Sequence, residues 1–406
     1  MRLLHTSDWH LGRMLYSKKD RNDEQAAFLK WLLANLMNHS VDLLIIAGDI
    51  FDTATPGNNT QKMYYDFLLK VRDTGCQNII IVGGNHDSPS FLNAPKEILA
   101  AINVCVIGNA SENPEDEVIV VKGKEDDPTA IVCAVPFLRE RDISHFIEGE
   151  SYSDRSQRMA EKIRKHYEKV AEIAAKKTEL NITERAGRQK KIPVIATGHL
   201  SVAGGKTIED DGVRDLYIGN IECIGSDIFS PIFDYVALGH YHIASVIDKN
   251  VRYSGSPIPM GFGEANQKKS VYIVEFNDIT PTITTLEIPV FQQMESIRGD
   301  KTHIFNRLEE LKKTDNSVWV EIIYDANDIF SDLSSWADEM TTQTKIEIIK
   351  FQNRQYLNEV LTQNDSMQSL DNLDKFEVFD ILLEKNNFPT EKKAELQELY
   401  QEITLE

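Results

Sequence analysis

Five apolar runs in the chain each lead directly into a short polar cluster. With the clusters that follow them, they read RLLHTS into DWH, VDLLIIA into GDIFD, NIIIVG into GNHD, IPVIAT into GHLS and YVAL into GHYH. Continuous apolar runs rich in β-branched residues are typical of strands that are buried on both faces. The pattern therefore predicts a polar cluster at the carboxyl end of each of five strands.

Segments with helical periodicity separate the first strands. Residues 24–38 and 60–74 are the two expected helices, and the first carries an apolar face formed by Phe28, Leu29, Leu32, Leu33 and Leu36. An alternation of strand and helix predicts a parallel sheet and an α/β fold. In such sheets the functional crevice lies outside the carboxyl ends of the strands, which is where the polar clusters would meet.

The middle of the chain predicts a second, partly antiparallel sheet. A long polar helix is expected near residues 155–180, and further strands are expected at 102–107, 118–123, 130–135, 245–253, 270–276 and 283–288. After Pro289 the chain has its own alternation of elements, with helices expected at 302–313 and 328–341 and strands at 318–325 and 345–351. This region reads as a separate α+β domain.

We therefore expect four parts along the chain: domains at 1–289 and 290–354, a polar linker at 355–373 and a helical hairpin at 374–406. The two short helices of the hairpin have narrow apolar faces formed by Phe376, Phe379 and Leu383 and by Leu396, Leu399 and Ile403. The hairpin either folds back on its own domain or binds a partner. The reach of the linker and the acidity of this region favour a partner with a basic surface.

Composition places the chain among soluble globular proteins. It has 406 residues, of which 41% are hydrophobic and 27% charged, and it has no apolar run long enough to span a membrane or to act as a secretory leader. Its four cysteines are widely spaced, which suits a reducing cytoplasm and disfavours a thiolate metal site.

The net charge of −20 is unevenly distributed, so it does not exclude a polyanionic substrate. Residues 155–191 hold 12 Lys/Arg against 5 Asp/Glu, whereas residues 355–406 hold 4 against 12. In the basic segment the cations are interleaved with Glu at helical spacing. We interpret that segment as a solvated helix face rather than a nucleic-acid site.

Histidine, carboxylate and amide side chains gather in the strand-end clusters. A lone histidine is more often structural than functional, but here the whole set requires an explanation: Asp8, His10, Asp49, Asp52, Asn85, His86, Asp87, His199, His240 and His242. This combination of ligand types without thiolate suits manganese, iron or zinc. The set is too large for one ion, and it fits two ions that share a bridging carboxylate.

The clusters carry a family resemblance. In order and spacing, these clusters resemble the five motifs of calcineurin-like metallophosphoesterases. They are SDWHLG (7–12), GDIFD (48–52), GNHD (84–87), TGHL (197–200) and LGHYH (238–242). The resemblance implies two packed mixed sheets flanked by helices. Four further features resemble the nuclease subunits of bacterial SbcCD-type complexes. They are HTSDWHLG at the start, VRDLYIG (213–219), GSPIPMGFGE (255–264), and the α+β capping domain with its terminal helices.

This resemblance implies roles for individual residues. One metal would be held by Asp8, His10, Asp49 and His242, and the other by Asp49, Asn85, His199 and His240, with Asp49 as the bridge and Mn²⁺ as the expected ion. His86 would be a catalytic residue that does not bind metal. Asp87 would either orient His86 or cap a turn, and Asp52 has no assigned role.

The resemblance also implies an activity and partners. The chain would be a hydrolase that degrades double-stranded DNA as an exonuclease and cuts single strands and hairpins as an endonuclease, in DNA recombination, replication and repair. It lacks a P-loop motif, so ATP dependence would come from an SbcC-type ATPase subunit with a coiled coil, bound by the hairpin. A homodimer within a heterotetramer, a cytoplasmic location and no membrane contact are expected. Contacts to DNA are expected from Arg13, Lys18, Lys19 and Arg21.

Two other classes of function remain open. The same motifs serve phosphoesterases of cyclic nucleotides, nucleotides and phosphoproteins, so the metal site alone does not choose the substrate. A non-catalytic scaffold is the third reading, and it is disfavoured because all the expected ligands are present. The additional α+β domain and terminal helices favour the nuclease.

Overall fold

The computed structural model describes residues 1–144, 150–183, 192–206, 224–277, 280–314, 316–326 and 333–353. The elements below belong to the larger of two compact units, Met1–Ile323 with Asp332–Gln352, except for the last residue of β16 and of β17. The expected linker and helical hairpin, with all six apolar residues singled out there, lie outside the described residues.

The first sheet has the strand order β14-β13-β1-β4-β5-β6. Its parallel strands are β1 (Arg2–Thr6), β4 (Leu43–Ala47), β5 (Asn78–Val82) and β6 (Val104–Ile107). Strands β13 (Ser270–Glu275) and β14 (Thr282–Glu287) extend it in antiparallel fashion beyond β1. The expected parallel core is confirmed, and the carboxyl ends of β1, β4 and β5 lie along one edge.

The second sheet has the order β11-β12-β10-β9-β8-β7 and is also mixed. Strands β8 (Pro128–Cys133), β9 (Val194–His199), β10 (Tyr235–Gly239) and β12 (Val251–Tyr253) are parallel, and β7 (Val118–Lys122) and β11 (Ser245–Asp248) are antiparallel edge strands. The segment expected to be one strand at 245–253 is a hairpin of two, because the chain reverses between Asp248 and Val251.

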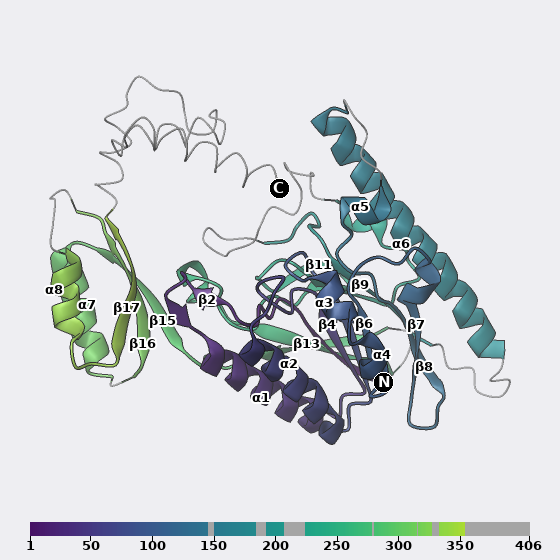
Figure 1. Cartoon of the computed structure of the whole chain (residues 1–406), viewed down its shortest axis with the longest axis horizontal. Coiled ribbons are helices and arrows are strands. Elements are labelled where there is room, and N and C mark those ends of the chain that lie inside the picture. The colour runs from purple at the N-terminus through teal and green to yellow at the C-terminus, as the bar shows by residue number, and fades with distance from the viewer. Residues whose placement is uncertain are drawn as a thin grey trace. The chain divides into compact units, whose positions relative to one another are not determined.

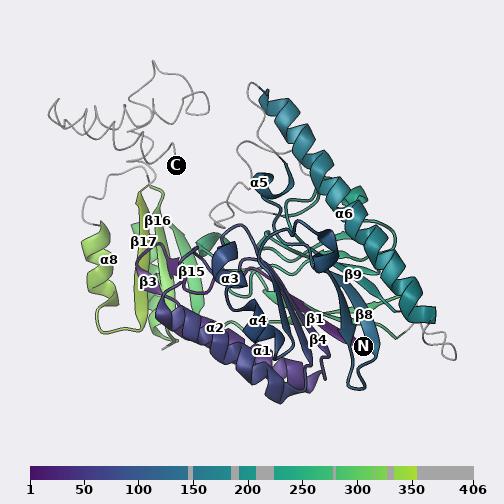
Figure 2. The same cartoon turned by 45° about the vertical axis from the view of Figure 1, so that its right-hand side comes forward.

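The two sheets pack face to face, with helices on their outer faces (Figures 1 and 2). Alternation along β4 explains this: Leu43 and Ile45 belong to the cluster between the sheets, whereas Leu44 and Ile46 pack with α1 (Asn22–Asn38) and α2 (Asn58–Val71). The long helix α6 (Tyr152–Thr183) covers the second sheet through residues that include Tyr167. This layered α/β arrangement confirms the expected fold class.

Short helices complete this region. They are α3 (Pro89–Asn93), α4 (Lys96–Ala100) and α5 (Glu140–Ile143), with 3₁₀ turns η1 (Arg72–Thr74), η2 (Pro114–Glu117), η3 (Ser226–Ile228) and η4 (Phe262–Glu264). No helix of the described residues is long and apolar enough to cross a membrane.

A smaller sheet of order β15-β16-β17 follows. It consists of β15 (Gln293–Gly299), β16 (Val318–Tyr324) and β17 (Ile346–Asn353), with helices α7 (Lys301–Lys312) and α8 (Leu333–Thr341). Strand β15 was not predicted, because its sequence QMESIRG is mostly polar and only two of its seven side chains are buried. Trp319 and Ile349 of this sheet share an apolar cluster with Leu15. Leu15 belongs to a short hairpin formed by β2 (Met14–Leu15) and β3 (Lys19–Asp20).

Three arginines in the described part of α6 form ion pairs. Arg158 pairs with Glu140 at 3.0 Å, and Arg164 pairs with Asp227 at 2.7 Å. Arg155 also pairs with Glu140. For these three residues the charge is balanced within the protein, which is in keeping with the interpretation as a solvated helix face.

Candidate metal centre

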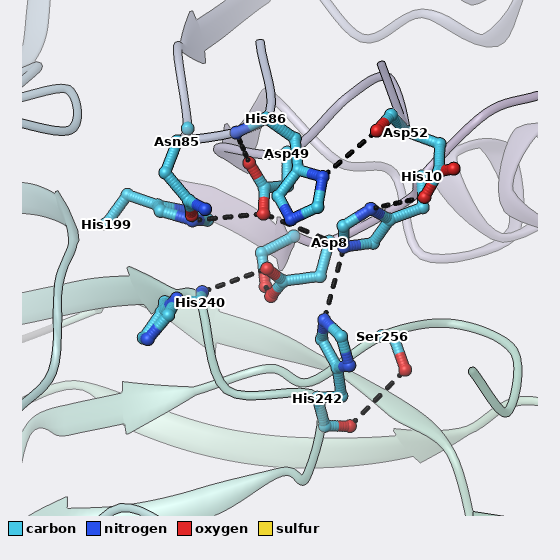
Figure 3. A network of polar contacts seen from close by, with 12 residues as sticks. Asp8, His10, Asp49, Asp52, Asn85, His86, His199, His240, His242 and Ser256 are labelled. Carbon is cyan, nitrogen blue, oxygen red and sulfur yellow. Dashed lines mark hydrogen bonds and ion pairs between the residues drawn. The ribbon is translucent and has the colours of Figure 1, made fainter. Parts of the chain in front are cut away.

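The expected site residues converge at the carboxyl ends of five strands (Figure 3). Asp8 and His10 follow β1, Asp49 and Asp52 follow β4, Asn85 and His86 follow β5, His199 ends β9, and His240 and His242 follow β10. Both sheets contribute, so the site forms only when the two sheets pack against each other. Apart from Asp52 and Asn85, these side chains are at least nine-tenths buried.

The backbone at the strand ends is held in unusual conformations. Asp8, His10, Asp49 and His240 all have positive φ, at 53°, 45°, 50° and 108°. Such conformations are costly for residues other than glycine, and they cluster at functional sites in proteins. A Cβ on Gly84 would lie 2.1 Å from Asp49 Oδ1, so only glycine permits this approach.

Asp49 lies at the middle of the cluster. Its Oδ2 is 3.6 Å from His10 Nε2 and 3.3 Å from His199 Nε2, and its Oδ1 accepts a hydrogen bond of 2.9 Å from the His86 backbone N–H. This position between two histidines from different sheets is the one that a bridging carboxylate requires.

His10, His242 and Asp8 form one group on the first side of Asp49. The Nε2 atoms of His10 and His242 are 3.2 Å apart, and the three residues each offer a ligand atom within 4.8 Å of the others. Two imidazole nitrogens and a carboxylate oxygen that point into one small space match the donor set of a divalent first-row metal.

His199 and Asn85 form a second group on the other side of Asp49. His199 Nδ1 lies 3.0 Å from the Ala47 carbonyl oxygen, which leaves Nε2 directed at Asn85 Oδ1, 2.9 Å away. In the neutral ring, these two atoms and Asp49 Oδ2 all present lone pairs to each other, an arrangement that a cation satisfies. The residues present therefore fit two divalent ions.

The His240 ring lies farther from the other proposed ligands. Its backbone N–H donates to Asp8 Oδ1 at 2.9 Å, and its ring centroid lies 5.5 Å from that of His199. It is absent from the groups of described residues whose ligand atoms lie within 4.8 Å of one another. Its role as a ligand remains a prediction.

Burial and opposite charges shift the pKa values in this site. Burial disfavours a charged His199, but the Asp49 carboxylate, together with Asp8 and the Ala47 carbonyl, outweighs burial and raises the pKa of His199 to about 9. Burial raises the pKa of Asp8 to about 6 and lowers that of His10 to about 4. Without metal, a proton on His199 thus compensates the charge of Asp49, and a metal ion would replace this proton.

Asp52 contacts a proposed ligand from outside the cluster. Its Oδ1 lies 3.3 Å from His10 Nδ1 and 3.0 Å from Arg13 Nη1. Burial opposes ionisation, yet His10 and Arg13 together lower the pKa of Asp52 to about 2. Asp52, which sequence reasoning left without a role, faces the outer nitrogen of His10 at ion-pair distance. A carboxylate in this position is the kind of outer partner that orients a ligand histidine.

His86 lies beside the first group. Its Nδ1 is 3.0 Å from the Asp52 backbone carbonyl oxygen, and its ring centroid is 4.8 Å from that of His10 in an edge-on arrangement. It also offers a ligand atom within 4.8 Å of His10 and Asp49. Geometry therefore permits His86 to bind metal as well as to act on the substrate.

Asp87 does not orient His86. Its carboxylate accepts hydrogen bonds from the backbone N–H groups of Ile50, Phe51 and Gly84 at 3.1, 3.0 and 2.9 Å. Asp87 therefore ties the loop after β4 to the loop after β5. This corrects the expectation that Asp87 assists catalysis by orienting His86, and it supports the turn-capping alternative.

Two further residues brace the site and were missed from the sequence. Arg139 Nη2 donates to the backbone carbonyls of Gly84 and Asp87 at 3.2 and 2.8 Å, and so holds the loop that carries Asn85 and His86. Glu264 Oε1 lies 3.6 Å from His242 Nδ1. Glu264 is in the segment GSPIPMGFGE, but no spacing rule connects it to a histidine 22 positions away.

The four basic residues after the first motif differ in their surroundings. Arg21 is buried and pairs with Glu24 at 2.7 Å, which makes the prediction of a DNA contact wrong for this residue. Lys18 Nζ donates to the Ile349 carbonyl at 3.2 Å, and Lys19 pairs with Glu347 at 2.5 Å, so both are directed at β17. Arg13, paired with Asp52, lies nearest to the cluster.

Comparison with known proteins agrees with this geometry. Residues 1–244 match the sequence model of the calcineurin-like phosphoesterases, and residues 290–387 match that of a type 5 capsule protein repressor C-terminal domain. The D subunit of the nuclease SbcCD from Escherichia coli K12 is 33% identical over 405 residues, which cover 98% of this chain and 97% of the relative. The corresponding D subunits from Rhodobacter capsulatus and Bacillus subtilis are 34% and 31% identical, each over 68% of this chain and 66% of the relative.

The fold and the site are those of a hydrolase that cleaves phosphate esters with divalent metal ions. The chain belongs to the calcineurin-like phosphoesterases and, within them, to the family of SbcCD nuclease D subunits. The resemblance noted from the five motifs is confirmed.

Proposed function

We propose that this chain is the metal-dependent DNA nuclease subunit of an ATP-driven SbcCD-type complex in DNA recombination, replication and repair. It would act as an exonuclease on double-stranded ends and as an endonuclease on single strands and hairpins. The observation that carries the proposal is the extent of the similarity to the D subunit of the nuclease SbcCD, which continues past the phosphoesterase domain to almost the whole chain.

The proposed metal ligands are Asp8, His10, Asp49 and His242 for one ion and Asp49, Asn85, His199 and His240 for the other, with Mn²⁺ as the expected ion. Bound ions of this kind lower the pKa of a water molecule and offset the charge of a phosphodiester. The buried carboxylates and imidazoles would hold these ions.

His86 is the proposed catalytic residue of the chain itself. The Asp52 carbonyl oxygen accepts a hydrogen bond from Nδ1–H, so the imidazolium form directs Nε2–H away from this contact. This proton is then available to the leaving sugar oxygen, or to the charge that develops on the phosphate. Arg13, Lys18 and Lys19 remain the proposed contacts to the DNA backbone, and Arg21 is withdrawn because it is buried.

The proposed assembly follows the same resemblance. Residues 374–406 would bind the coiled coil of an SbcC-type ATPase subunit, and a homodimer of this chain would lie within a heterotetramer in the cytoplasm. The proposed organisation is a nuclease domain at 1–289, a capping domain at 290–354 and a linker at 355–373. Truncation at Gln355 should leave Mn²⁺-dependent cleavage of single-stranded DNA intact and abolish co-purification with the ATPase. Full co-purification of the truncated chain would place docking elsewhere.

The alternatives are a phosphoesterase of a nucleotide, cyclic nucleotide or phosphoprotein, and a non-catalytic scaffold. Purified chain with Mn²⁺ should be assayed side by side on linear DNA, a phosphoprotein and a cyclic nucleotide. We expect turnover of DNA to dominate. Preference for either of the other substrates would refute the nuclease assignment, and no turnover of any substrate would favour the scaffold.

A further inference from the structure

A buried ion pair lies directly behind the proposed ligand His242. Glu264 and Lys269 pair with each other, and both are almost inaccessible to solvent, with 0% and 6% of their surface exposed. Lys269 Nζ also donates to the His242 carbonyl oxygen and to Ser256 Oγ, each at 3.0 Å. Figure 3 shows Ser256 beside the His242 carbonyl group.

The two carboxylate oxygens of Glu264 have different surroundings. Oε2 accepts from Lys269 and from the Met260 backbone N–H, the latter at 3.0 Å. Oε1 is fully buried and has no hydrogen-bond partner among the described residues, and it faces His242 Nδ1 at 3.6 Å. On the far side of the same ring, Nε2 points to His10 Nε2, 3.2 Å away.

Stability alone does not explain this pair. Removing two charges from water has a large free-energy cost, and apolar residues of similar volume often stabilise a fold equally well. What apolar residues cannot supply is an oxygen behind His242. Two of the other proposed ligand histidines also have an oxygen behind Nδ1: Asp52 Oδ1 lies 3.3 Å from His10, and the Ala47 carbonyl lies 3.0 Å from His199.

We propose that Glu264 is a positioning residue that accepts the Nδ1–H of His242 and so turns Nε2 toward the metal, and that Lys269 holds Glu264 in place. The inference rests on the proposed role of His242 as a ligand. Outer partners of this kind fix the tautomer and the orientation of a ligand histidine, and their loss costs about 10–100-fold in metal affinity. Within the described residues, Lys269 is the buried cation that pairs with this carboxylate.

The test compares two double variants that both remove the buried charges. Glu264→Met with Lys269→Met removes the acceptor, whereas Glu264→Gln with Lys269→Met keeps a carbonyl oxygen at the same place. Equilibrium binding of Mn²⁺ to the full chain, followed by the electron paramagnetic resonance of the free ion, gives the stoichiometry and both dissociation constants. We expect the Met pair to bind one of its two ions about 10–100-fold more weakly, and the Gln variant to recover most of this loss.

Glu117→Gln is the matched control. Glu117 is equally buried and lies 2.7 Å from His166 Nε2, but it contacts none of the proposed ligands among the described residues. It should lower the melting temperature and leave both dissociation constants unchanged. Wild-type affinities for both ions in the Met pair would overturn the inference.

His242→Ala separates this inference from the proposed site. If it retains both ions at wild-type affinity, His242 is not a ligand and both assignments fall. If it loses one ion while the Met pair keeps both, only the role of Glu264 falls. Should the Met pair not fold, long-range ¹H–¹⁵N spectra of the zinc-loaded wild-type chain decide: a protonated, slowly exchanging Nδ1 of His242 supports the inference, and an unprotonated Nδ1 overturns it.

Discussion

The two sides of the metal cluster are both largely buried but are braced by different chemistry. On the Asn85 and His199 side, each support involves a backbone carbonyl: His199 Nδ1 meets the Ala47 carbonyl, and the Arg139 side chain holds the carbonyls of Gly84 and Asp87. On the His10 and His242 side, the supports are the carboxylates of Asp52 and Glu264.

This difference has a chemical consequence. A backbone carbonyl is supplied by the fold and cannot be removed by substitution, whereas a carboxylate can be replaced and also changes the basicity of the ring it faces. The affinity of the His10 and His242 side should therefore respond strongly to single substitutions around it. The other side should respond mainly to changes in the shape of its loop.

Removal of the carboxylate shared by both sides should have the largest effect. Asp49→Ala is expected to lower turnover by at least about 10³-fold and to deplete bound metal. The reason is that the carboxylate that bridges the two cations, and that contributes several kcal/mol to holding them, is lost. Metal analysis of the purified variant together with a nuclease assay measures both. Retention of two ions would show that Asp49 is not the bridge.

His86→Ala should affect chemistry and leave binding alone. We expect turnover to fall by about 10²–10⁴-fold, the usual contribution of a proton donor, while both ions stay bound. The variant is assayed for nuclease rate and metal content in parallel with Asp49→Ala. An emptied metal position would make His86 a ligand and would redraw the first side of the cluster.

Asp52→Asn and Arg139→Ala test the contrast between the two sides directly. Asp52→Asn should weaken the binding of one Mn²⁺ ion by about 10–100-fold, because the substitution removes the negative charge that faces His10 Nδ1. Arg139→Ala should weaken the binding of the other ion by a smaller factor, because His199 keeps its hydrogen bond to the Ala47 carbonyl. Dissociation constants from Mn²⁺ titrations report this, and loss of the same ion in both variants would remove the distinction.

The effect of pH on the metal-free chain should be smaller. Burial opposes protonation of His199, but Asp49 raises its pKa to about 9, above the ordinary value of 6.5. The protonated ring therefore stabilises the metal-free fold fully below pH 6.5, and this contribution is lost as the pH rises through about 9. Melting temperatures across this range should decline, and the decline should flatten in His199→Gln. Mn²⁺ affinity should rise over the same range because the ion displaces this proton.

The amino-acid sequence predicts the ligands better than their supports. Apolar runs that end in Asp, His and Gly identify the strand ends, and parallel strands of one sheet bring those ends to one edge, so the strand pattern places Asp8, Asp49 and Asn85 together. The approach of His199 depends on the packing of the second sheet against the first, which the pattern does not predict. Glu264 ends the 3₁₀ turn η4 and Arg139 directly precedes α5, and the positions of both depend on tertiary packing. No local pattern connects them to the ligands. For Arg21 the sequence led to a wrong prediction. A surface position was expected, but Arg21 is buried and pairs with Glu24 in the interior.

The positions of the bound metal ions test the two-metal centre most directly. A crystal of the full chain soaked in MnCl₂ and measured at the manganese absorption edge should show two anomalous peaks that share Asp49. One should lie among Asp8, His10 and His242, and the other among Asn85, His199 and His240, with His86 outside both coordination spheres. A single peak, or a peak coordinated by His86, would contradict the two-metal centre described above.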